Sequence, residues 1–281
     1  NKSDAEIDMA LRLGLRQIIV DNLDELARLA SRSEAIRQSG VQLALRLAPG
    51  VDPITHQAIA TGQEDSKFGL NISDGSAERA LGIALESGLP LTGFHAHVGS
   101  QLLDPDAQTV SARRIAEFAV LAMDTFGFEA KELNLGGGLG IRYTEEDDPL
   151  EVEAYVAAVC GAANDVLKPA GLAPTLVQEP GRALIGEAGV TLYTICGAKR
   201  VTKADGDARM LLAVDGGMAD NPRPALYGAK YSVRAMSSSD QRALTEDETI
   251  LATIAGRHCE TDTLFEDVSI DRHAQLGRVT A

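Results

Sequence analysis

The stretch ARRIAEFAVLAMDTFGFEAKELNLGGGLG, residues 112–140, decides the fold class of this chain. Apolar residues recur at helical spacing over Ala112–Phe126, and a short apolar run over Glu132–Leu135 then ends in glycines. A helix that leads directly into a strand is the repeating unit of a parallel α/β sheet, because parallel strands need a crossover connection. We therefore expect further copies of this unit on either side.

The same alternation fills the first two thirds of the chain. One helix is expected to start at the capping box Ser3-Asp4-Ala5-Glu6 and to stop near Gly14, and a second to start after Asn22. Three more are expected over Ser76–Ser87, Ala112–Phe126 and Glu151–Leu167. The expected strands are Gln17–Val20, Val41–Leu47, Leu91–His97, Glu132–Leu135 and Thr175–Glu179. These are fewer units than a closed (β/α)8 barrel needs. The pattern predicts an α/β fold, either an open sheet or a TIM-type barrel whose first strands lie before Asn1.

After Arg182 the pattern changes to a period of two, which indicates strands without intervening helices. The expected strands are Val190–Val201, Arg209–Val214, Lys230–Met236, Thr249–Arg257 and Leu264–Ile270, with an exposed loop over Ser237–Glu248. We therefore expect two domains, a barrel domain over residues 1–188 and a β-domain over residues 189–281.

Composition limits the function classes. The chain has 281 residues, with 26 basic and 41 acidic side chains and a net charge of −15, so nucleic acid is not an expected partner. Its three cysteines contain no CxxC pair, which favours a reducing compartment, and we expect a cytoplasmic protein. No apolar stretch reaches the roughly 18 residues of a membrane span.

Two histidines end one of the expected strands, in the sequence Phe94-His95-Ala96-His97. Strand alternation puts His95 and His97 on the same face, either as hydrogen-bonded interior residues or as groups that share a pocket. A zinc site would need further ligands on later strands. The other histidines, His56, His258 and His273, do not lie there, so no metal is expected.

The next two expected strands end in a glycine run and in QEPGR, residues 178–182. Glycines after a strand let backbone N–H groups approach a phosphate, although they also suit a tight turn. Glu179 can hold a ring nitrogen in its protonated form, and Arg182 offers a planar fork to phosphate or carboxylate. The alternative for Glu179 and Arg182 is a plain ion pair.

Two further motifs lie in the second half. Arg223 and Tyr227 are four residues apart, so both lie on one face if the segment is helical, where they can bind a carboxylate. Cys259 and Glu260 follow an apolar strand, and a thiol beside a carboxylate is a plausible proton donor.

Five motifs occur in order, namely HAHVGSQ (95–101), LNLGGGLG (133–140), QEPGR (178–182), VDGGMADNPRPALYG (214–228) and GRHCE (256–260). In this order and at this spacing they resemble the pyridoxal-phosphate-dependent diaminopimelate decarboxylases. The resemblance extends from Asn1 to about Ile270 and implies an alanine-racemase-like fold, a (β/α)8 barrel followed by a β-domain. It also implies a homodimer with shared active sites and decarboxylation of meso-diaminopimelate to L-lysine.

The resemblance also implies roles for individual residues. His97 stacks on the cofactor ring, Glu179 pairs with its nitrogen, and the phosphate end is held by Ser100, Gly136, Gly137, Gly138, Gly181 and Arg182. Arg182, Arg223, Tyr227 and Glu260 bind the substrate, and Cys259 donates a proton from the partner subunit. Ornithine- and arginine-type decarboxylases need no group for a second carboxylate, so Arg223 and Tyr227 favour diaminopimelate.

The chain departs from the family pattern at three places. None of its seven lysines stands on an early barrel strand, where the family carries its Schiff-base lysine. The Gly-Ala-Tyr segment near the family's C-terminus is missing, and Thr261-Asp262-Thr263 is one residue shorter than the family's sequence after Cys-Glu. We therefore expect a section of a complete subunit that is inactive by itself. The alternatives are an ornithine- or arginine-type decarboxylase and a lysine-less, non-catalytic relative that binds a partner subunit.

Overall fold

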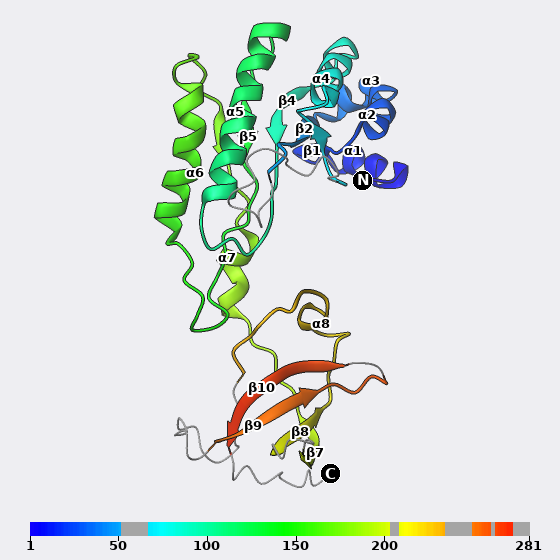
Figure 1. The fold of residues 1–281 in the computed structure, drawn as a ribbon. Coiled ribbons are helices and arrows are strands. Elements are labelled where there is room, and N and C mark those ends of the chain that lie inside the picture. The colour runs from blue at the N-terminus through cyan, green and yellow to red at the C-terminus, as the bar shows by residue number, and fades with distance from the viewer. Residues whose placement is uncertain (52–66, 203–207, 234–248, 260–261, 272–281) are drawn as a thin grey trace. The chain divides into compact units, whose positions relative to one another are not determined.

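The computed structural model describes residues 1–51, 67–202, 208–233, 249–259 and 262–271 (Figure 1). Contacts divide the chain into two compact units, residues 1–141 with 148–188, and residues 142–147 with 189–281. The short segment 142–147 thus belongs with the second unit, although the sequence patterns place it in the first.

The first unit is built on a parallel sheet. Its strands run in the order β1 (Gln17–Val20), β2 (Gln42–Ala48), β4 (Leu91–His95), β5 (Glu132–Asn134) and β6 (Thr175–Val177), and β3 (Leu70–Asn71) also pairs with β2. The helices of the unit are α1 (Asp4–Leu13), α2 (Leu23–Ala30), α3 (Ser33–Ser39), α4 (Ser76–Glu86), α5 (Asp106–Phe126), α6 (Val152–Leu167) and α7 (Gly181–Ile185), followed by the 3-10 turn η1 (Gly186–Ala188). Because neighbouring strands are parallel, their carboxyl ends lie at one edge of the sheet.

Local sequence explains where the first helices begin and end. Ser3 and Glu6 form the predicted capping box, in which the Glu6 N–H donates to the Ser3 hydroxyl and the Ser3 N–H donates to the Glu6 carboxylate. Gly14 ends α1 in a left-handed conformation, and the side chain of Asn22 accepts the Glu25 N–H at the start of α2.

The core of the first unit lies between the sheet and its helices. Phe94 on β4 is fully buried, and its ring makes edge-on contacts with Phe118 of α5 at 4.9 Å and with Phe128 at 5.8 Å between centroids. Such pairs stabilise by about 0.5–1.5 kcal/mol beyond the area that they bury. The packing fixes β4, whose carboxyl end carries His95.

The second unit is a four-stranded sheet in the order β10 (Thr263–Asp271), β9 (Thr249–Ala255), β8 (Ala208–Val214) and β7 (Ile195–Thr202). All pairs are antiparallel except β8 with β9. A small core of Leu212, Val214, Ala252, Ile254 and Leu264 lies on this sheet. The unit also contains the short helix α8 (Arg223–Tyr227).

Several sequence predictions need correction. Residues 190–194 are not in the strand expected to begin at Val190, and α5 begins at Asp106 rather than at Ala112. Residues 230–233 form no strand, because the N–H and hydroxyl of Ser232 donate to the Tyr143 carbonyl instead of to a sheet partner. Residues 234–236 and the expected loop 237–248 lie outside the described residues. The patterns also missed α3 and β3.

Among the described residues, no helix has the length and apolar character needed to cross a membrane.

Candidate active site

Three neighbouring strand ends bring the predicted motifs of the first unit together. His95 at the end of β4 is the register partner of Asn134 at the end of β5, and Asn134 is the register partner of Val177 on β6. The loops that follow also pair, since the Leu102 N–H donates to the Gly138 carbonyl at 2.9 Å and the Gly140 N–H to the Leu102 carbonyl at 2.8 Å. HAHVGSQ, the glycine run and QEPGR therefore share one edge of the sheet.

Glu179 is the acidic group at this edge. His95 Nε2 lies 3.2 Å from Glu179 Oε2, and Asn134 Nδ2 donates to Oε1 at 2.9 Å, while half of the Glu179 side chain is exposed. Burial raises the pKa of Glu179, but the hydrogen bond from Asn134 and the interactions with His95 outweigh it, so that the pKa lies below its usual value. The group is an oriented carboxylate at neutral pH.

His95 and His97 differ in burial. His95 is buried, and this burial lowers its pKa, with Glu179 opposing the shift only in part. His97 is exposed, and its pKa is lowered by partial desolvation and by the positive charge of Arg46. The Gly137 N–H donates to His97 Nδ1 at 3.4 Å, which places the proton of the neutral ring on Nε2.

The glycine run is needed for close packing of the strand ends. Gly136 has a φ of +75°, and a Cβ there would collide with the Ala96 carbonyl oxygen, while a Cβ on Gly137 would collide with the Glu179 carbonyl oxygen. Gln108 of α5 is buried and donates to the Gly137 carbonyl. The N–H groups of Gly136 and Gly137 donate to Asn134 and His97, although the sequence had suggested a phosphate as their partner.

Gln101 links the remaining predicted residues of this edge. It adopts a left-handed φ of 60°, and its side-chain oxygen accepts from Arg182 at 3.1 Å and from the Ile141 N–H at 3.3 Å. Ser100 precedes it and is exposed, and Gly181 begins α7, the helix that carries Arg182. Glu179 thus contacts His95 and Asn134, whereas Arg182 donates to Gln101.

Sequence reasoning missed Asn134, Gln101 and Gln108. Each is an amide that bonds to a residue of another segment, Asn134 to Glu179, Gln101 to Ile141 and Arg182, and Gln108 to Gly137, and no spacing in the chain indicates such a role. The position of Asn134 at a strand end directly before the glycines was the one available signal.

The second unit holds two of the predicted substrate residues. Arg223 and Tyr227 lie on α8, so the segment is helical, as their predicted position on one face requires. Arg223 donates to the Tyr231 hydroxyl at 2.8 Å and to the Tyr143 hydroxyl at 3.4 Å, and both rings lie within 6 Å of its guanidinium carbon, at 5.8 and 5.5 Å. Tyr227 is 76% exposed. The two tyrosines that hold Arg223 were not predicted.

Cys259 ends the segment after β9 and carries an exposed free thiol, whereas Glu260 lies outside the described residues. The buried carboxylate of Asp262 holds this segment. Its Oδ1 accepts the Met218 N–H at 2.6 Å, and its Oδ2 accepts the His258 N–H at 2.9 Å and lies 2.6 Å from His258 Nδ1. The segments 216–218 and 256–258 are thereby fixed to one anion.

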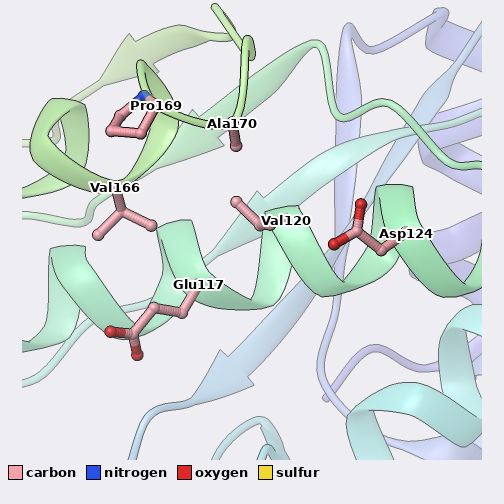
Figure 2. Close-up of a pocket in the computed structure, with 6 residues that line it drawn as sticks. All are labelled: Glu117, Val120, Asp124, Val166, Pro169 and Ala170. Carbon is pink, nitrogen blue, oxygen red and sulfur yellow. The ribbon is translucent and has the colours of Figure 1, made fainter.

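A shallow depression of about 500 Å³ lies on the outer face of α5 and α6 (Figure 2). Figure 2 shows its lining residues, Glu117, Val120, Asp124, Val166, Pro169 and Ala170. These residues belong to the later turns of α5 and α6 and the turn that follows, which lead into the amino ends of β5 and β6. The depression therefore lies at the edge of the sheet opposite Glu179.

Comparison with known proteins agrees with the geometry. Residues 1–186 match the family described as "Pyridoxal-dependent decarboxylase, pyridoxal binding domain". A diaminopimelate decarboxylase from Bacillus methanolicus is 43% identical over 97% of this chain and 61% of its own length. The diaminopimelate decarboxylase from Bacillus subtilis strain 168 is 41% identical over 96% of this chain and 60% of its own length.

A solved structure shows the same arrangement. The diaminopimelate decarboxylase from M. jannaschii in co-complex with L-lysine has a TM-score of 0.80 and 30% identity, over 97% of this chain and 60% of that one. This similarity confirms the expected fold class, a TIM-type barrel followed by a β-domain. The chain spans about three fifths of the length of these relatives. The chain belongs to the pyridoxal-dependent decarboxylases, and residues 1–186 are its match to their pyridoxal-binding domain.

Proposed function

We propose that the whole protein to which this chain belongs decarboxylates meso-diaminopimelate to L-lysine, a step of lysine biosynthesis. The observation that carries the proposal is the oriented Glu179 carboxylate beside His97 and the glycine run. It occurs in a chain that is 43% identical to a diaminopimelate decarboxylase. The choice of substrate rests on the relatives named above, and the location of the site rests on the contacts at the strand ends.

The residues at this edge fit pyridoxal 5′-phosphate. Glu179 is ionised and half exposed, so it can accept a hydrogen bond from a protonated pyridine nitrogen, and His97 is exposed next to it. Ser100, Gly138, Gly181 and Arg182 are assigned to the phosphate end, together with the backbone of Gly136 and Gly137, whose N–H groups donate to Asn134 and His97 in this structure. When bound, the cofactor supplies the electron sink for cleavage of the bond between Cα and the carboxylate.

The protein's own residues orient the substrate and donate the proton that replaces its lost carboxylate. A protonated ring nitrogen deepens the electron sink, and Glu179 favours that protonation because its negative charge stabilises the pyridinium. Arg223, with Tyr227 and Glu260, is assigned to the distal amino-acid end of the substrate. Cys259 is assigned as proton donor, its Sγ–H proton passing to the carbon that has lost carbon dioxide and leaving a thiolate at Sγ.

We further propose that the protein is a cytoplasmic homodimer in which Cys259 of one subunit serves the site of the other. Light scattering of the whole protein is expected to give twice the subunit mass. A monomer with full activity would contradict the shared site.

Supplying the whole, cofactor-loaded protein with diaminopimelate, ornithine and arginine tests the substrate. Carbon dioxide release is expected chiefly from diaminopimelate, because Arg223 provides a cation for its second carboxylate. Arg223→Ala is expected to lower kcat/KM for diaminopimelate roughly 10- to 100-fold, the cost of a lost charge-assisted hydrogen bond.

A matched control for Arg223→Ala is Arg113→Ala, because Arg113 is an exposed arginine of α5 that forms an ion pair with Asp165 of α6. Arg113→Ala is expected to leave all three rates unchanged. Equal loss on all three substrates in Arg223→Ala would contradict the assignment of this residue.

A further inference from the structure

His95 is a buried histidine to which the proposed reaction gives no role. Its side chain is 8% exposed, compared with 50% for that of Glu179. Within the part of the chain that the structure describes, its Nδ1 has no hydrogen-bond partner, whereas Nε2 lies 3.2 Å from Glu179 Oε2. A neutral imidazole beside a carboxylate carries its proton on the facing nitrogen, because the other tautomer would bring two lone pairs together. His95 is therefore a donor to Glu179.

Asn134 provides a second donor to the same carboxylate. Its Oδ1 accepts the Gly136 N–H at 2.9 Å, so its amide is oriented with Nδ2 toward Glu179 Oε1, also at 2.9 Å. His95 and Asn134 are register partners on β4 and β5, so the sheet itself fixes the spacing of the two donors. Each oxygen of Glu179 thus has one donor.

We propose that His95 and Asn134 are positioning residues that hold the Glu179 carboxylate with one neutral donor on each oxygen. The proposal rests on the proposed function, in which Glu179 meets the ring nitrogen of the cofactor. A carboxylate oxygen accepts more than one hydrogen bond, so a lone pair remains for the ring. Neutral donors restrict the rotation of the carboxylate without cancelling its charge, whereas a lysine or arginine in their place would compete with the pyridinium.

Other charged groups also face this pair. Arg46 and His97 act on His95, and His97 also acts on Glu179. The effect of the His95 hydrogen bond on Glu179 is therefore tested with variants that remove this donor and leave Arg46 and His97 unchanged.

The first experiment compares His95→Phe, His95→Gln and Asn134→Asp in the whole protein. Phenylalanine fills the site without a donor, glutamine restores an N–H, and aspartate keeps the acceptor for Gly136 while it replaces the donor by a like charge. The control is Thr92→Val on β4, the strand of His95, which removes the hydrogen bond that Thr92 Oγ1 donates to the Leu43 carbonyl of β2 and the one that it accepts from Gln17.

The main measurement is the pKa of Glu179 in the cofactor-free protein, followed by carbon-13 NMR of labelled glutamate and assigned with Glu179→Gln. We expect an upward shift of the Glu179 pKa in His95→Phe, because the ionised form loses a hydrogen bond, and a larger one in Asn134→Asp, because the ionised form also gains a like charge as its neighbour. His95→Gln and Thr92→Val are expected to keep the wild-type pKa. In the loaded enzyme, His95→Phe is expected to lower kcat roughly tenfold with little change in KM, and His95→Gln to recover most of it.

The outcomes separate this proposal from the proposed function. An unshifted Glu179 pKa in folded His95→Phe and Asn134→Asp, or a loss in His95→Gln as large as in His95→Phe, would overturn the positioning role. Shifted pKa values without decarboxylation of any substrate would support the positioning role and reject the proposed reaction. Circular dichroism identifies the folded variants, and if His95→Phe fails to fold, His95→Leu, which also lacks a donor, takes its place.

Discussion

At the residue scale, the surroundings of the acidic groups decide what they can do. Glu179 and Asp262 are both held by donors from other segments, and in both the hydrogen bonds outweigh the effect of burial, so that the pKa falls. They differ in exposure. Glu179 keeps half of its side chain open to a ligand, whereas the Asp262 side chain is 2% exposed and is surrounded by backbone N–H groups and His258. Glu179 can therefore bind a ligand, whereas Asp262 stabilises the fold of the second unit.

Asp262 is expected to make the second unit sensitive to acid. Its folded pKa is depressed, so its contribution to stability is present above the pKa of the unfolded carboxyl group and is lost as the pH falls through the folded value. Asp262→Asn removes the ionised acceptor and is expected to cost about 1–3 kcal/mol of unfolding free energy at pH 7. Urea unfolding between pH 7 and pH 3 measures both effects.

The control for Asp262→Asn is Asp165→Asn, because Asp165 is an exposed carboxylate that forms an ion pair with Arg113. This control is expected to follow the wild-type acid profile within a few tenths of a kcal/mol. If Asp262→Asn lost as much stability at pH 3 as at pH 7, ionisation would not be the cause.

At the scale of elements, the site depends on how closely the strand ends approach. The loop after β5 lies against the loop after β4 and the start of QEPGR, and glycine is the residue that permits this approach. The phosphate role of the glycine run is a separate proposal, which the close approach of the strand ends does not test. Two of its N–H groups are already bonded to Asn134 and His97.

Gly137→Ala is expected to be destabilising, because its Cβ would overlap the carbonyl oxygen of Glu179. Backbone shifts of this kind cost about 1–3 kcal/mol, and they would move Glu179 away from Asn134 and His95. The midpoint temperature of thermal unfolding and the cofactor affinity of the whole protein are both expected to fall.

Gly161→Ala on α6 is the matched substitution, since nothing lies within 4 Å of an added Cβ there. A helix-interior glycine costs roughly 0.5–1 kcal/mol relative to alanine, so this variant is expected to be more stable than the wild type. A Gly137→Ala variant as stable as Gly161→Ala would refute the close-approach argument.

At the scale of the whole molecule, the chain spans about three fifths of its relatives. The family carries its cofactor-bearing lysine on an early barrel strand, and none of the seven lysines here stands in that context. Residues 1–281 by themselves are therefore expected to release no carbon dioxide from diaminopimelate, even with added pyridoxal phosphate.

The control for this test is the whole protein under the same conditions, which is expected to be active. Sequencing the reading frame upstream of Asn1 tests whether it encodes a strand that carries such a lysine. Substrate-dependent carbon dioxide release by residues 1–281 alone would show that one of the seven lysines serves as the attachment point.

The sequence by itself determined the alternation of helices and strands, the change to a β-sheet after Arg182, and the motifs that name the family. These are properties of local periodicity and local spacing, which a chain displays without being folded. It therefore predicted that His97, the glycine run and Glu179 end neighbouring strands. It failed where a segment's partners lie elsewhere, as for residues 230–233, which bond to Tyr143 instead of joining the sheet.

Only the tertiary structure decided which side chains meet. The contacts of Glu179 with His95 and Asn134 connect segments of three neighbouring strands. Arg223 donates to Tyr231 nearby and to Tyr143, which is 80 residues away in the sequence. Such contacts depend on register and on the path of loops, which sequence spacing does not encode. The sequence therefore indicated which residues carry the chemistry, and the folded sheet decided which neighbours orient them.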